Sequence, residues 1–161
     1  MIYRPNGDGT YTNIASGASP HWDQVNEAGD GSGIYTNSVT YEYDTYAFAD
    51  PTETGTINSV TVHIRCFTDT AGTSYAKAAI RSGGTMYYGS EESVTSTTTS
   101  FSKTWTTDPK TSAAWTWSNL NSAEIGVSLK YGTGSYVNCS QVYVEIDFTR
   151  IGGSYARAIG L

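Results

Sequence analysis

The chain is poor in leucine and in charge. Among its 161 residues only three are leucine (Leu120, Leu129 and Leu161), and charged residues make up 15%, against about 25% in typical domains. Because Thr, Ser, Tyr, Val and Gly are plentiful instead, the composition disfavours long helices and favours strands joined by tight turns. The surface must then be covered largely by hydroxyls, amides and tyrosines.

Clustered positive charge is also missing. Nine Lys and Arg are scattered singly against fifteen Asp and Glu, which gives a formal charge of −6 and a pI near 4.7. Neutralising phosphates takes several clustered cations, so we expect neither nucleic acid nor an anionic membrane surface as a partner. No apolar stretch is long enough to span a bilayer. The first residues lack a cationic segment followed by an apolar one, so we expect a protein used without export.

Cysteine is nearly absent, and its two positions both fall in strand-like runs. Cys66 shares the inward parity of Val60, Val62 and Ile64, whereas Cys139 is out of phase with Val142. A bulge near Ser140 is needed to turn Cys139 inward. A disulfide remains open, but two reduced thiols packed as small apolar residues are favoured. No second pair of Cys or His accompanies them, so we expect no metal and no cofactor.

What the chain has is strict alternation. Val142, Val144, Ile146 and Phe148 alternate with polar residues, the pattern of a half-buried strand. Similar runs follow one another at short intervals and predict an all-β, antiparallel, jelly-roll-like sandwich of eight or nine short strands. The expected strands are 2–4, 11–14, 45–49, 57–67, 74–82, 85–88, 97–106, 124–131 and 136–148.

The connections carry their own signals. Residues 6–10, Asn-Gly-Asp-Gly-Thr, predict a hairpin turn. Residues 22–39 predict a surface excursion pinned by Trp22 and Val25. Residues 118–123 predict one helical turn with Ser118 as its N-cap. We expect one sandwich domain over residues 1–149 and a C-terminal arm or tail over residues 150–161.

Catalytic patterns are weak. The carboxylate pairs Glu42/Asp44, Glu91/Glu92 and Glu145/Asp147 are local runs, and nothing marks any pair as a glycosidase site. His21 and His63 lack a nucleophile or metal motif around them. The acidic loop 23–30 has enough carboxylates for one calcium ion, but a solvated loop is the better reading. We therefore expect no enzymatic activity.

Aromatic residues are the most informative surface feature. Tyr41, Tyr43 and Tyr87 form a possible glycan platform, since aromatic rings pack on sugars and on protein partners. For the tryptophans Trp105, Trp115 and Trp117, plugging the ends of the sandwich is the favoured role.

Several motifs together resemble small β-sandwich proteins encoded among the virion genes of tailed bacteriophages. They are Y-R-P-N-G-D-G-T, H-W-D-Q-V-N-E, D-T-Y-A-F-A-D, I-N-S-V-T-V-H-I-R, W-T-T-D-P-K-T-S-A-A-W-T-W-S-N-L-N, E-I-G-V and Q-V-Y-V-E-I-D-F, which span roughly residues 4–148. The resemblance implies a non-enzymatic structural protein of the virion, first of all a capsid decoration (cement) protein on the outer capsid surface, assembled in the host cytoplasm. It brings no catalytic residues.

For that role we expect the two ends of the chain to contact the major capsid protein, another virion protein or neighbouring subunits of a homo-oligomer, with a trimer favoured. The expected contact residues are Ile2, Tyr3, Ile151, Tyr155, Arg157, Ile159 and Leu161. One alternative is a receptor- or glycan-binding module of a head or tail fibre. Another is a secreted carbohydrate-binding module.

Overall fold

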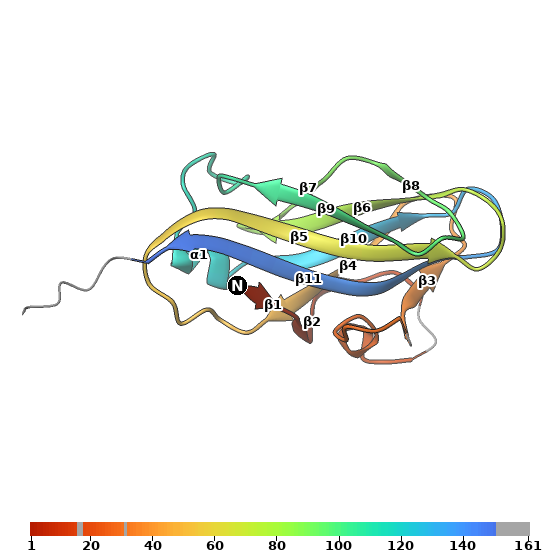
Figure 1. The fold of residues 1–161 in the computed structure, drawn as a ribbon, viewed down its shortest axis with the longest axis horizontal. Coiled ribbons are helices and arrows are strands. Elements are labelled where there is room, and N and C mark those ends of the chain that lie inside the picture. Colours follow the sequence, from red (N-terminus) through yellow and green to blue (C-terminus); the bar gives the residue numbers. More distant parts are fainter. Residues whose placement is uncertain (16–17, 31, 151–161) are drawn as a thin grey trace, which may run out of the picture.

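Two antiparallel β-sheets packed face to face make up the computed structural model, which describes residues 1–15, 18–30 and 32–150 (Figure 1). The β11 sheet contains β1 (Ile2–Tyr3), β11 (Val137–Thr149), β5 (Thr56–Thr68) and β9 (Thr99–Trp105) in that order, and β3 (Ile34–Thr36) also pairs with β11. The β10 sheet contains β2 (Pro5–Thr12), β4 (Glu42–Phe48), β10 (Glu124–Lys130), β6 (Ser74–Ser82) and β7 (Thr85–Tyr88), and β8 (Glu92–Val94) also pairs with β6.

The chain alternates between the sheets, from β4 to β5 to β6 and later from β9 to β10 to β11. This wiring places strands far apart in sequence side by side and confirms the predicted jelly-roll-like sandwich. The prediction of eight or nine strands was too low, because eleven are present in the described part of the chain. The additional ones are short, and three residues or fewer give no alternation to detect.

Alternation decides which side chains form the core. Val60, Val62, Ile64 and Cys66 of β5 are all fully buried, as their shared parity predicted. On β6 the inward residues are the small Ala76 and Ala78 together with Ile80, which also are buried.

The cysteine prediction is confirmed in detail. Cys139 lies directly opposite Cys66 in the ladder between β11 and β5, and the register shifts between Cys139 and Gln141, so Ser140 is the bulged residue. Both thiols are buried and free. Burial raises the pKa of the Cys66 thiol well above its ordinary value, which keeps it protonated and unreactive.

Two local predictions were wrong, the turn at residues 6–10 and the N-cap of the helix. Residues 6–10 are not a hairpin turn but the middle of β2, whose pairing with β4 is irregular between Pro5 and Gly7 and between Asp8 and Thr12. A Cβ at Gly9 would lie 2.5 Å from Thr45 Oγ1, so a glycine there permits close approach of the strands rather than a turn.

The helix α1 (Trp117–Asn121), the one α-helix among the described residues, begins earlier than predicted. Its N-cap is Thr116, not Ser118: Thr116 is extended, and its side chain accepts a hydrogen bond from the Asn119 backbone N–H. No helix within the described residues is long and apolar enough to cross a membrane.

The excursion after residue 20 folds onto the sandwich. It contains a 3-10 helix, η1 (His21–Gln24), and the short strand β3. Val25 is fully buried and Trp22 packs against the core, so both predicted pins are confirmed.

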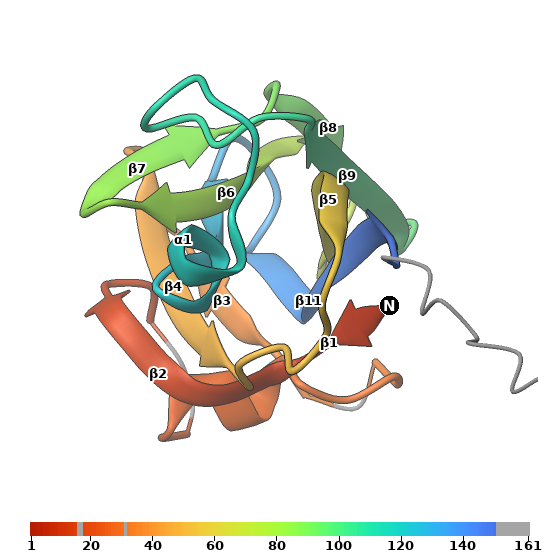
Figure 2. The ribbon, with the colours of Figure 1, turned by 90° about the vertical axis from the view of Figure 1, so that its left-hand side faces the viewer.

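Tryptophans close one end of the sandwich, where α1 lies between the two sheets (Figure 2). Trp115 is 4% exposed and its indole N–H donates to the Trp105 carbonyl over 3.1 Å. The Trp117 indole donates to the Gly55 carbonyl over 2.9 Å, and its ring packs edge-on against Phe148. The predicted plugging role of the tryptophans is therefore confirmed.

Candidate ligand-binding site

The outer face of the β10 sheet has a floor of small side chains. This floor is made by two rows of residues that face one another across the strands. In the first row, Tyr43 of β4, Ser128 of β10 and Lys77 of β6 are neighbours. In the next row, Gly126 of β10 is opposite Ala79 of β6. Ser128 and Ala79 are both nearly or fully buried. Since paired residues of an antiparallel ladder project from the same face, larger neighbours stand around this floor as walls.

The walls are tyrosines that lean over the floor. Tyr88 of β7 stands opposite Ala79 of β6, so three strand spacings, about 14 Å, separate it from β4. Even so, the centroids of the Tyr43 and Tyr88 rings are only 6.4 Å apart, in an edge-to-face arrangement. Tyr11 packs edge-on against the Tyr43 ring at 5.0 Å and supports it from β2. Small residues on the middle strands are what leave room for these rings to approach.

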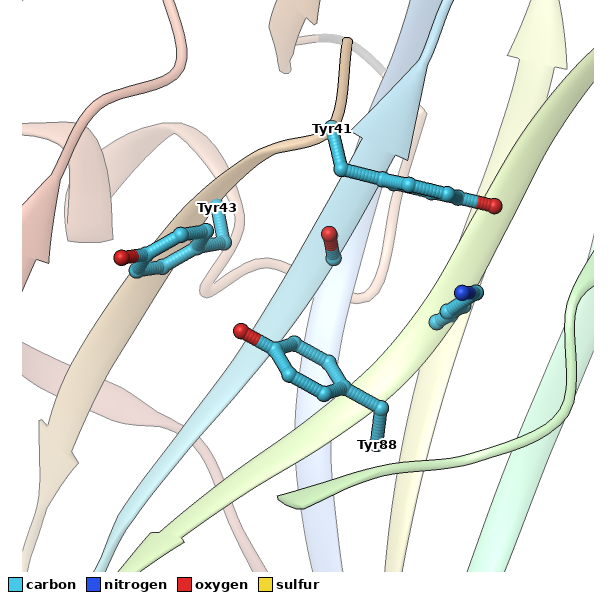
Figure 3. A pocket seen from close by; sticks show the side chains of 5 residues that line it. Tyr41, Tyr43 and Tyr88 are labelled. Carbon is cyan, nitrogen blue, oxygen red and sulfur yellow. The ribbon is translucent and has the colours of Figure 1, made fainter. Parts of the chain in front are cut away.

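A hollow of about 160 Å³ is lined by Tyr41, Tyr43, Lys77, Tyr88 and Ser128, here called the tyrosine pocket (Figure 3). Figure 3 shows the rings of Tyr41, Tyr43 and Tyr88 placed around it on different sides. An engineered cavity of about 150 Å³ holds one benzene molecule, so this hollow has room for about one six-membered ring.

Hydrogen bonds fix the Tyr41 ring. Its hydroxyl donates to Glu91 Oε2 over 2.6 Å, and Lys130 Nζ reaches the same oxygen at 3.3 Å. Burial raises the pKa of the Tyr41 phenol and the bond to Glu91 raises it further, while that bond holds the pKa of Glu91 below its ordinary value. Tyr41 therefore stays a neutral, oriented wall at physiological pH.

Two polar groups point into the pocket from the middle strands. Lys77 Nζ lies 4.1 Å from the centroid of the Tyr41 ring, a cation–π contact. Ser128 Oγ donates to the Glu42 carbonyl over 3.2 Å, which leaves its lone pairs free to accept. The pocket thus offers aromatic surface, one ammonium donor and one hydroxyl acceptor.

Tyr87 is not part of this site. It stands opposite Ile80 and packs against the core, whereas Tyr88 takes the place in the pocket that the sequence analysis gave to Tyr87. On a four-residue strand both parities carry a tyrosine, so only the pairing with β6 decides which one faces outward. Tyr41 and Tyr43 do line the pocket.

Sequence reasoning missed Lys77 and Ser128. Lys77 sits between the inward Ala76 and Ala78, and that alternation was a usable signal for its outward position. No local signal places Ser128 beside it, because their neighbourhood depends on the register between β10 and β6.

The two predicted contact residues at the N-terminus, Ile2 and Tyr3, differ in how exposed they are. β1 pairs with β11 of the same chain, and the partly buried Tyr3 packs against the core with its ring 6.2 Å from that of Phe48. Ile2 is 57% exposed. The other predicted contacts, Ile151, Tyr155, Arg157, Ile159 and Leu161, lie outside the described residues.

The carboxylate candidates lie in very different surroundings. Asp44 is fully buried, where its carboxylate contacts His21 Nδ1 at 2.7 Å and accepts from the Ile14 N–H at 2.8 Å. Burial raises the pKa of Asp44 against these contacts, and the cluster anchors η1 to β4. Glu145 and Asp147 are exposed on the β11 sheet, on the opposite side of the sandwich from the tyrosine pocket.

The acidic loop 23–30 is held by protein groups. Asp30 accepts from Arg65 Nε and from Ser140 Oγ, both at 2.8 Å, and these bonds lower its pKa to about 2. Among the described residues, no group of three or more His, Cys, Asp or Glu side chains is arranged to hold a metal ion.

No protein-family model matches this chain, and no curated protein matches it in sequence. Among solved structures it is similar to a carbohydrate-binding module, CBM6cm-2 of lichenase 5A from Cellvibrio mixtus, in complex with cellotriose. The TM-score is 0.38 and the identity 10%, over 93% of this chain and 98% of that one. A likeness this loose says nothing about what the present chain binds.

Proposed function

We propose that the protein is a non-catalytic glycan-binding β-sandwich module whose binding site is the tyrosine pocket. The observation that carries this proposal is the placement of Tyr41, Tyr43 and Tyr88 around a floor of small residues. Concave sites lined by aromatic rings with a few fixed polar groups are typical of small-ligand binding.

Binding needs little rearrangement. One sugar ring fills the hollow with its C–H groups beside the packed rings of Tyr43 and Tyr88, while Ser128 Oγ accepts from a sugar hydroxyl. Tyr88 is 41% exposed in the free protein, so a bound sugar can still remove part of its ring from water and gain binding free energy from that burial. Tyr11 and Glu91 hold the other two rings in place, which limits the entropy lost on binding.

Hydrolysis is not part of the proposal. In the described chain, Glu91 is the one carboxylate that hydrogen-bonds a pocket side chain, and Tyr41 and Lys130 already occupy it. Glycoside hydrolysis by the usual route needs two carboxyl groups across the scissile bond.

The test is a binding screen followed by two matched substitutions. Neutral and acidic oligosaccharides are screened by array, and the affinity of each hit is measured by calorimetry. Tyr88→Ala is expected to weaken binding about tenfold, or about 1.4 kcal/mol, because it removes a wall of the pocket. Tyr136→Ala is the control, since Tyr136 is a similarly exposed tyrosine in an edge-to-face pair with Tyr35, outside the pocket. Equal effects of the two substitutions, or no bound glycan at all, would contradict the proposal.

A place in a virion remains a prediction from the resemblance. A head or tail fibre module and a secreted module are both compatible with glycan binding, whereas capsid cementing was expected to use the chain ends. Of those ends, Ile2 is exposed and Tyr3 is partly buried against the core. Imaging of an intact particle would separate many copies over a shell from few copies at fibre tips.

A further inference from the structure

We infer that the tyrosine pocket selects an acidic sugar, one whose ring carries a carboxylate, and that Lys77 is the residue that determines this selectivity. The inference rests on the proposed function and adds the class of ligand.

Lys77 forms no close ion pair within the described residues, although its charge reaches Glu91 at longer range and helps to lower the pKa of that carboxyl. No carboxylate of the described chain lies within 4.0 Å of its ammonium group, which lies 4.1 Å from the centroid of the Tyr41 ring. A ring face leaves the N–H donors of an ammonium group unused, since it accepts no strong hydrogen bond.

The neighbouring Lys130 shows the contrast. It contacts the same Tyr41 ring, at 4.7 Å, but its ammonium group is also paired with Glu91 at 3.3 Å. Glu91 is thus in direct contact with Lys130 and the Tyr41 hydroxyl, whereas Lys77 acts on it only through longer-range electrostatics. Of the two lysines on this ring, Lys77 is the one that also lines the pocket.

An acidic sugar complements this arrangement in one pose. Its carboxylate accepts from Lys77 Nζ, and its ring rests in the hollow beside Tyr43 and Tyr88. Hydrogen bonds between charged groups are stronger than neutral ones, and the phenol walls reduce competition from water. Binding of an acidic sugar depends on this local positive charge because the whole chain, with a formal charge of −6, repels anions at long range.

Matched ligand pairs test the charge and leave the ring in place. The pairs are trigalacturonate with its methyl ester, and 3′-sialyllactose with its methyl ester; each affinity is measured by calorimetry at low and at high salt. We expect at least one acid to bind about tenfold tighter than its neutral counterpart, and salt to reduce that difference.

Two lysine variants identify the residue. Lys77→Met keeps the apolar stem, and it is expected to abolish the preference for the acid without changing the affinity for the neutral counterpart. Lys103→Met is the control: Lys103 also lies over an aromatic ring, that of Trp105, but in the β11 sheet. It is expected to leave both affinities unchanged.

The failures are distinguishable. If neutral sugars bind as well as acids and Tyr88→Ala still weakens them, glycan binding stands and the acidic preference is wrong. If acids are preferred but Lys77→Met keeps the preference, the assignment to Lys77 is wrong. If no sugar of either kind binds, both proposals are wrong.

Discussion

Two buried carboxylates, Asp44 and Asp108, have pKa values shifted in opposite directions by their surroundings. Asp44 is fully buried and its pKa is raised, mainly by burial. Asp108, in the crossover before α1, is 1% exposed and is also desolvated. Its pKa is nevertheless lowered, because it accepts hydrogen bonds from Ser82 Oγ, the Lys110 N–H, Thr111 Oγ1 and Asn119 Nδ2.

Asp108→Asn is expected to lower the free energy of unfolding at pH 7 by roughly 1–3 kcal/mol, since an amide cannot accept all four bonds. A folded-state pKa below the unfolded value stabilises the fold above the unfolded pKa. The loss should therefore shrink as pH falls below about 4. Urea unfolding at pH 7 and at several acidic pH values measures it.

Asp147→Asn is the control, because Asp147 is exposed on β11 and, within the described residues, accepts from the Asn58 side-chain amide alone. We expect a change within about 0.5 kcal/mol. A loss for Asp108→Asn no larger than for this control would contradict the role of the cluster.

At the scale of elements, the long central strand β11 depends on one bulge. Cys139 stands opposite Cys66 and Gln141 stands opposite Arg65, so Ser140 is an extra residue between two partners that are adjacent on β5. The bulge reverses the parity of β11 and brings both Cys139 and Val142 to the core.

Deleting Ser140 is thus expected to give a folded protein with a regular ladder, whereas deleting Tyr143 from the same strand should prevent folding. Loss of Tyr143 shifts one side of the strand by one residue and turns its core residues outward. Loss of Ser140 removes its hydrogen bond to Asp30 and should cost roughly 1–2 kcal/mol. Near-UV circular dichroism and urea unfolding separate the two results. If both deletions prevent folding, the bulge does more than set parity.

At the scale of the whole molecule, the first residues cover an edge of the β11 sheet. Ile2 and Tyr3 pair with Glu145 and Val144 of β11, and the Ile146 N–H donates to the Met1 carbonyl over 2.7 Å. An uncovered strand edge offers unpaired backbone groups to another chain.

Removing residues 1–3 is therefore expected to cause concentration-dependent self-association, which light scattering after size-exclusion chromatography measures. Ile2→Ala keeps the backbone pairing and loses only an exposed side chain, so it should behave like the unaltered chain. If the truncated chain keeps the oligomeric state of the unaltered one at all concentrations, covering the edge has no such role.

Much of the architecture could be predicted because it depends on local patterns. Alternation along β5 and β11 identified the inward residues, and the phase conflict at Cys139 required the bulge that the structure has. Errors arose where a local pattern has two meanings. Glycines in residues 6–10 indicate a turn or a close strand contact, and both Thr116 and Ser118 are good caps.

The sequence by itself determined which faces of the long strands are apolar, and hence the sandwich, its core and its tryptophan-plugged end. Only the tertiary structure decided that Tyr88 rather than Tyr87 lies beside Tyr43, and that Lys77 and Ser128 share their row. The physical reason is that side-chain parity follows from the period of a single strand, whereas neighbourhood across a sheet depends on strand order and register. Those are fixed by contacts between segments far apart in the chain.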